Sequence, residues 1–113
     1  LGLEKVLMKP ITIIKQTLAN GGFTPESVKG RYIVATPSNE KTVALKHFTK
    51  SLVSAYARLA NQQGLAIGTW VNKSKVYLDT VKGFEDLVEA LDFARISNQL
   101  AIYDREEDKE IFL

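Results

Sequence analysis

The chain of 113 residues contains no cysteine and only one histidine. The absence of cysteine excludes a disulfide scaffold, a cysteine-ligated zinc site and a cysteine nucleophile. A single histidine excludes a multi-histidine metal centre. No apolar run approaches the ~18 residues that a membrane-spanning helix needs, and no signal-peptide pattern opens the chain. We therefore expect a soluble intracellular protein that binds no membrane, metal or cofactor.

The composition that remains is that of an ordinary globular domain. Hydrophobic residues make up 45% and charged residues 25% of the chain, which excludes wholesale disorder and a collagen-like architecture. A chain of this length is typical of one domain with its own core. We expect a single domain over residues 1–113. Residues 1–9 are then a cloning remnant or a flexible N-terminal segment. If residues 1–7 are the remnant, Met8 is the natural start; the alternative is that the chain is a piece cut from a larger protein.

Charge is distributed unevenly along the chain. Residues 1–82 hold 12 lysine and arginine against 4 acidic residues, whereas residues 83–113 hold 3 against 9, so a net charge of +8 is followed by −6. One interpretation is a basic face for nucleic acid or for an acidic partner protein. The alternative is that the oppositely charged parts neutralise each other across the fold.

Apolar residues at spacings of three and four predict three amphipathic helices. The first covers residues 10–20, the second begins at Leu45 and ends at Gln63, and the third begins at Gly83 and ends near Asn98. Glycine or asparagine, which accept the left-handed cap conformation, stand at or beside each end.

Strand signals lie between these helices. Residues 31–35 are rich in β-branched and aromatic side chains and predict a strand. Residues 38–40 (SNE) predict a turn, and residues 41–45 predict either the returning strand or the entry to the next helix. A hairpin is predicted from residues 65–71 and 75–79 with a turn between them.

The end of the chain predicts a strand over residues 100–103, an acidic turn over 104–108 and a closing strand over 110–113. Short helices that bury one stripe each need a common sheet to cover. The sequence therefore predicts an α+β fold, a small and mainly antiparallel sheet of about five strands with three helices packed on one side.

No arrangement of residues indicates catalysis. The hydroxyl residues near His47 share its predicted helix, and side chains on one helix rarely converge on a reacting atom. The glycines match neither the dinucleotide nor the Walker spacing, and residues 104–110 lack the glycine of a calcium loop. Asp79 is either a functional carboxylate beside aromatic residues or a cap for the next segment. An enzyme would depend on Asp79, His47, Arg31 or the tyrosines, and we expect no enzyme.

Two groups of residues are candidates for binding a partner. Aromatic residues and charges on the predicted hairpin form the first group: Trp70, Lys75, Tyr77 and Asp79. A polar, mostly basic stripe on the second predicted helix forms the other: Lys46, Lys50, Ser54 and Arg58. Stacking aromatics with nearby cations are typical of single-strand nucleic-acid binding, for which Lys73 would add a contact. The alternatives are core aromatics and a solvated helix face.

Several segments together resemble an accessory module of phages, prophages and conjugative elements, found beside capsid-morphogenesis or polyvalent proteins. The resemblance covers residues 21–104 and rests on the following segments: GGFT at 21–24, GRYIVA at 30–35, LAIGTWV at 65–71, KVYLD at 75–79, EALDFAR at 89–95 and NQLAIYD at 98–104. Residues 80–83 (TVKG) depart from it, since the module is often acidic there. The resemblance implies a fold and a mobile-element setting, with a cytoplasmic location in a bacterial host cell or a virion-associated one, and it brings no catalytic residues.

These observations favour a non-enzymatic accessory module that acts by protein–protein contact. A specific form is an anti-CRISPR-like inhibitor of a host defence nuclease. The alternative is a nucleic-acid-binding module that uses the basic stripe and the hairpin, with phosphate contacts that weaken in salt.

Overall fold

The computed structural model describes residues 8–113, which form three α-helices, one 3-10 turn and six strands. In chain order the elements are α2 (Pro10–Asn20), β1 (Gly22–Phe23), β2 (Tyr32–Ala44), η1 (Leu45–His47), α3 (Lys50–Gln62), β3 (Ala66–Asn72), β4 (Lys75–Phe84), α4 (Leu87–Ile96), β5 (Ala101–Asp104) and β6 (Lys109–Phe112). Residues 1–7, on which most of the expectation for the N-terminal segment falls, lie outside the described residues.

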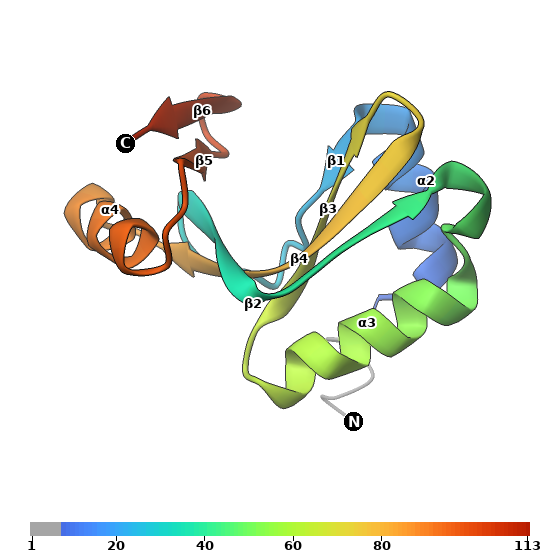
Figure 1. The fold of residues 1–113 in the computed structure, drawn as a ribbon. Helices are drawn as coiled ribbons and strands as arrows, with labels where there is room; N and C mark the ends of the chain where they lie inside the picture. The colour runs from blue at the N-terminus through green and yellow to red at the C-terminus, as the bar shows by residue number, and fades with distance from the viewer. Residues whose placement is uncertain (1–7) are drawn as a thin grey trace.

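The strands form one curled antiparallel sheet in the order β1-β3-β4-β2-β5-β6. Helices α2 and α3 cover one arm of the sheet and α4 lies under the other (Figure 1). On β4, Val76 and Leu78 join the core with α2 and α3, while Phe84 packs against the α4 core. Alternate residues of a strand share a face, and these three residues are an even number of positions apart. The core under α2 and α3 and the core under α4 therefore lie on the same side of the sheet. The predicted α+β fold is confirmed, with six strands.

Two apolar clusters fill the space between the helices and the sheet. The larger lies under α2 and α3, and its buried members are Ile13, Phe23, Phe48, Val53, Tyr56, Ile67, Val76 and Leu78. The smaller lies under α4 and contains Val34, Ala90, Ala94 and Ile102. Burying a valine, leucine, isoleucine or phenylalanine side chain contributes ~1.5–3 kcal/mol, so these clusters hold the helices on the sheet.

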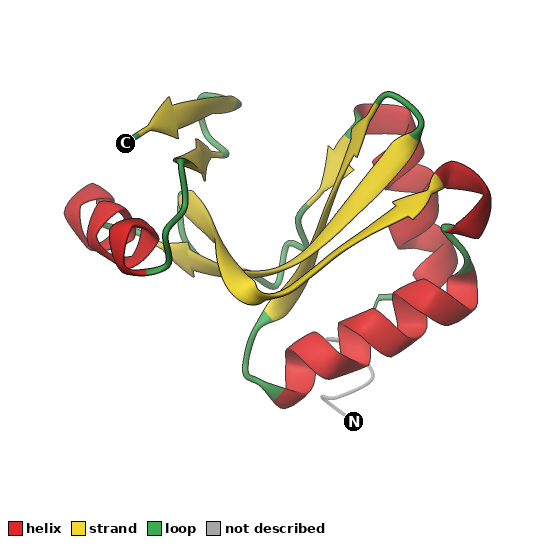
Figure 2. Cartoon of the chain, viewed as in Figure 1, coloured by secondary structure: helices red, strands yellow, loops and turns green. Residues whose placement is uncertain are grey.

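The opposite side of the sheet carries no helix within the described residues (Figure 2), and we call it the open face. The segment of residues 24–31 crosses it to connect β1 to β2, and Val28 packs there on Ile33 and Val81. Gly83 permits this crossing, because a Cβ at that position would overlap the carbonyl oxygen of Lys29.

The crossing segment is held in place from the C-terminal end of the chain. The guanidinium of Arg105 donates to the carbonyl oxygens of Val28 at 2.6 Å, Gly30 at 3.1 Å and Pro25 at 3.4 Å. Gly30 has a φ of 111°, and a Cβ there would lie 2.6 Å from the backbone of Phe84. Only glycine accepts this combination of conformation and close approach.

The predicted turn at residues 38–40 is wrong, because β2 is one strand of 13 residues. Its register against β4 shifts between Thr36 and Lys41, which pair with Thr80 and Leu78. Pro37 lies in this irregular stretch. Because the ladder is interrupted there, the lack of an N–H group on proline removes no regular hydrogen bond between the strands. Residues 41–44 continue the same strand. They are therefore in a strand, as one alternative predicted, but this strand does not turn back on residues 31–35.

Two predicted helix starts are also wrong. Residues 45–47 form a separate 3-10 turn, and α3 begins after Thr49, whose side chain accepts a hydrogen bond from the backbone N–H of Leu52. Gly83 lies in β4, and α4 begins after Asp86, whose carboxylate accepts from Glu89 N–H. In both places a side-chain cap sets the true boundary.

The local predictions with strong signals are confirmed. Helix α2 covers residues 10–20 and ends at Gly21 in the left-handed conformation. The hairpin of β3 and β4 has a turn of two residues, Lys73 and Ser74, between the paired Asn72 and Lys75. The C-terminal pair of strands also forms as expected, as β5 and β6.

Candidate functional site

Trp70 and Tyr77 form an aromatic pair on the open face. The two residues are register partners in the β3–β4 ladder, and their rings stack with centroids 4.3 Å apart and planes 13° apart. Thr69 points to α2, where its hydroxyl bonds that of Thr17, so the next side chain points the other way. Trp70 is 44% exposed, so part of the largest side chain in the sequence meets solvent beside Tyr77.

The interruption in β2 lies opposite Asp79. Between the pairs Thr36–Thr80 and Lys41–Leu78, β2 has the four residues 37–40 and β4 has only Asp79. Such bulges redirect side chains and are frequent beside functional sites. Asp79 lies within β4 and does not end a strand, so it is no cap for the following segment.

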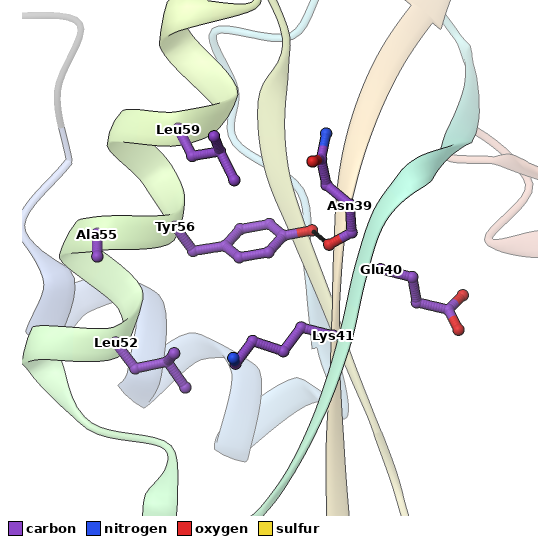
Figure 3. Close-up of a pocket in the computed structure, with 7 residues that line it drawn as sticks. All are labelled: Asn39, Glu40, Lys41, Leu52, Ala55, Tyr56 and Leu59. Carbon is purple, nitrogen blue, oxygen red and sulfur yellow. Dashed lines mark hydrogen bonds between the residues drawn. The ribbon is translucent and has the colours of Figure 1, made fainter.

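Asp79 and Glu40 form a carboxyl pair beside the aromatic pair. Asp79 is only 8% exposed, and its Oδ1 has no hydrogen-bond partner among the described residues. Burial raises the pKa of Asp79 to about 6, and the Glu40 carboxyl adds to the increase through its charge and a hydrogen bond. Glu40 is exposed, and Figure 3 shows its side chain directed away from α3. The pair therefore combines a buried, orphaned oxygen with a carboxylate that meets solvent.

A shallow groove of ≈360 Å³ lies on the helix side of the same interruption, between α3 and β2 (Figure 3). Tyr56 forms its floor, with its hydroxyl 2.5 Å from the carbonyl oxygen of Asn39 and 3.1 Å from that of Leu78. Burial raises the pKa of Tyr56 to about 12, with smaller contributions from the two carboxyls. The hydroxyl thus remains a donor and ties α3 to the irregular part of β2.

The structure separates the two predicted groups of binding residues. Trp70, Tyr77 and Asp79 share the open face, with exposed Lys75 at the start of β4. The basic stripe lies on the helix side, with Lys50 and Arg58 exposed on α3 and Lys46 on the 3-10 turn rather than the helix. One strand of nucleic acid lying on the hairpin would not contact both groups.

Of the residues considered for catalysis, His47 and Arg31 do not join Asp79 and the tyrosines beside it. His47 is exposed in the 3-10 turn. Arg31 donates two hydrogen bonds to Asp104, of 2.9 and 2.8 Å, and the pair lies at the β2–β5 junction. Within residues 8–113 no group of three or more histidine, cysteine or acidic residues could hold a metal ion. The helices of the same range include none that is long and apolar enough to cross a membrane.

Glu40 is the site residue that the sequence did not reveal. It lies 39 positions before Asp79 and within a segment that reads as a turn, so no spacing rule connects the two. Comparison with family models, curated proteins and solved structures gives no match to this chain. The resemblance to a mobile-element module therefore stays a prediction, and the site is interpreted from its own chemistry.

Proposed function

We propose that this protein is a non-enzymatic module that binds a partner protein through the uncovered part of the open face. The observation that carries the proposal is the stacked, 44% exposed Trp70 on a rigid hairpin. Tryptophan and tyrosine dominate the energetic centres of protein interfaces, and their few rotatable bonds make ordering them inexpensive in entropy.

The carboxyl pair favours protein over nucleic acid as the partner. Asp79 and Glu40 adjoin the aromatic pair, and negative charge beside a stacking platform repels a phosphate backbone. The cations of α3 that would attract phosphates lie on the other side of the sheet. A mobile-element origin, and inhibition of a host nuclease as the specific task, are extensions of this proposal.

The experiment is a selection from a displayed random peptide library against the folded protein. Peptides that bind are then measured against Trp70→Ser and, as a matched control, Leu59→Ser. Leu59 is 37% exposed and lies on α3, on the helix side. We expect binding to weaken at least tenfold in Trp70→Ser, in line with an interface centre worth ~1.4 kcal/mol or more, and to be unchanged in Leu59→Ser.

The proposal fails if the selected peptides bind Trp70→Ser as tightly as the unchanged protein, or if the only ligands found are oligonucleotides. A circular-dichroism spectrum and a urea transition for each variant separate lost binding from lost folding. Single-stranded oligothymidylate at low and at physiological salt serves as the nucleic-acid arm, because phosphate contacts weaken steeply with salt.

A further inference from the structure

We infer that the uncovered part of the open face binds an arginine side chain of the partner, seated between the aromatic pair Trp70–Tyr77 and the carboxyl pair Asp79–Glu40. This inference rests on the proposed function and specifies the chemistry that the face recognises. It is carried by the geometry of the two pairs and by the absence, among the described residues, of a cation paired with either carboxyl.

The aromatic pair supplies one half of such a site. Tyr77 occupies one side of the Trp70 indole at a centroid distance of 4.3 Å, and the exposed remainder of the indole faces solvent. Tryptophan is the aromatic residue that attracts cations most strongly. A guanidinium is planar and stacks on such a ring while its N–H groups remain free to donate.

The carboxyl pair supplies the other half. Asp79 follows Tyr77 by two residues on the same strand face, and its Oδ1 is buried without a partner. Glu40 stands beside it at the surface. Carboxylates accept the paired donors of a guanidinium in a fixed planar geometry, so a cation bound at Glu40 would also offset the charge of Asp79.

Asp104 shows how this chain satisfies a buried carboxylate elsewhere. Arg31 donates to both of its oxygens, and the backbone N–H groups of Glu106 and Glu107 donate to Oδ1. Among the described residues Asp79 and Glu40 form no ion pair of this kind. A buried acid without such partners is costly to ionise, and a cation from outside the chain would remove that cost.

The neighbouring elements leave the position open to an external cation. On β2, Lys41 projects toward α3 and away from Glu40 (Figure 3). On β3, Gly68 lies opposite Asp79 and adds no side chain. From the helix side, Tyr56 directs its hydroxyl to the backbone carbonyl of Leu78. On β4, Lys75 shares the face of Asp79 but lies four residues away, ~13 Å along the strand. Among the described residues, the titratable groups around Asp79 are therefore Glu40, Tyr77 and Tyr56, none of which is cationic.

The test uses a tryptophan-free peptide of alternating arginine and glycine, titrated into the whole protein. Trp70 is the only tryptophan of the chain, so its fluorescence reports directly on the site. We expect saturable binding that weakens about fivefold in Glu40→Gln, the size of an exposed charge pair. Glu107→Gln is the matched control, because it removes one exposed charge from the acidic turn, and it should leave the affinity unchanged.

A pH series adds a measurement that distinguishes this site from nonspecific attraction between the basic peptide and the acidic residues of the chain. Because burial raises the pKa of Asp79 to about 6, its carboxyl should take up a proton as pH falls through this value, and the affinity of the unchanged protein should then fall about threefold. Asp79→Asn should bind weakly at every pH and show no such step. An alternating glutamate–glycine peptide should not bind.

The inference is overturned if the arginine peptide leaves Trp70 fluorescence unchanged, or if Glu40→Gln and Glu107→Gln bind it equally. The proposed function is tested separately. If library peptides without a cationic residue lose binding in Trp70→Ser and keep it in Glu40→Gln, the face binds protein but does not read arginine.

Discussion

Asp79 lies directly opposite Gly68 in the β3–β4 ladder, while on its other side β2 places four residues where a regular strand would place one. The carboxylate is thus enclosed by backbone on both flanks and has one direction left, toward the open face. This placement explains why its pKa rises and why a second carboxyl, Glu40, comes to lie beside it.

Asp79→Asn should stabilise the protein at neutral pH. The pKa of Asp79 is about 6 in the folded chain against 3.8 without the fold, so the folded state binds more protons between these values. Its stability therefore falls as pH rises through this window. Removing the ionisation should raise the free energy of unfolding at pH 7–8 by up to ~3 kcal/mol. The gain should vanish below pH 4, as urea titrations from pH 4 to 8 would show.

Arg31→Met should destabilise the protein and make it more sensitive to acid. The hydrogen bonds from Arg31 lower the pKa of the Asp104 carboxyl to about 2. The pair therefore contributes stability above pH 4 that is lost as pH falls toward 2. In the variant the acid-unfolding midpoint should move to higher pH. Arg95→Met is the control, since Arg95 and Asp92 form an exposed pair on α4, and an unchanged midpoint in both variants would contradict the expectation.

Gly83→Ala should cost ~3 kcal/mol or more in unfolding free energy, because the added methyl group overlaps the carbonyl oxygen of Lys29 and forces the crossing segment off β4. Limited proteolysis should then cut within residues 24–31 before the rest of the chain. Lys82→Ala, an exposed neighbour on the same strand, is the matched control. Equal urea midpoints for the two variants would show that the crossing segment is not held as described.

Tyr56→Phe should lower the free energy of unfolding by ~1–2 kcal/mol, because the backbone carbonyls of Asn39 in β2 and Leu78 in β4 lose their donor. Amide hydrogen exchange in residues 38–41 should accelerate. Tyr103→Phe removes a hydroxyl that bonds only exposed Asp108 and should cost less. Were both substitutions to cost the same, the hydroxyl of Tyr56 would not hold β2.

The confirmed predictions depend on signals that lie close together in the chain. Pro10, the apolar spacing that follows it and Gly21 define α2 within a dozen residues. Trp70 and Tyr77 read as strand residues because the hairpin that carries them is local. Periodicity and turn chemistry suffice for such elements.

The predictions that were wrong concern segments whose structure is determined by contacts with residues far away in the sequence. Residues 38–40 have the composition of a turn, but pairing with β4 keeps them inside a strand. Gly83 resembles a helix start, but the crossing segment requires it within β4. The meeting of Glu40 with Asp79 depends on the register across the interruption, which no local pattern encodes.

The contacts of Arg105 have a consequence for the order of events during synthesis. The segment between β1 and β2 emerges early from the ribosome, yet the guanidinium that fastens it belongs to the turn after β5. About 75 residues must be added before this fastening is possible. The early strands are therefore synthesised before the hydrogen bonds of Arg105 can form. Folding of the whole domain is completed only after the C-terminal hairpin has been made.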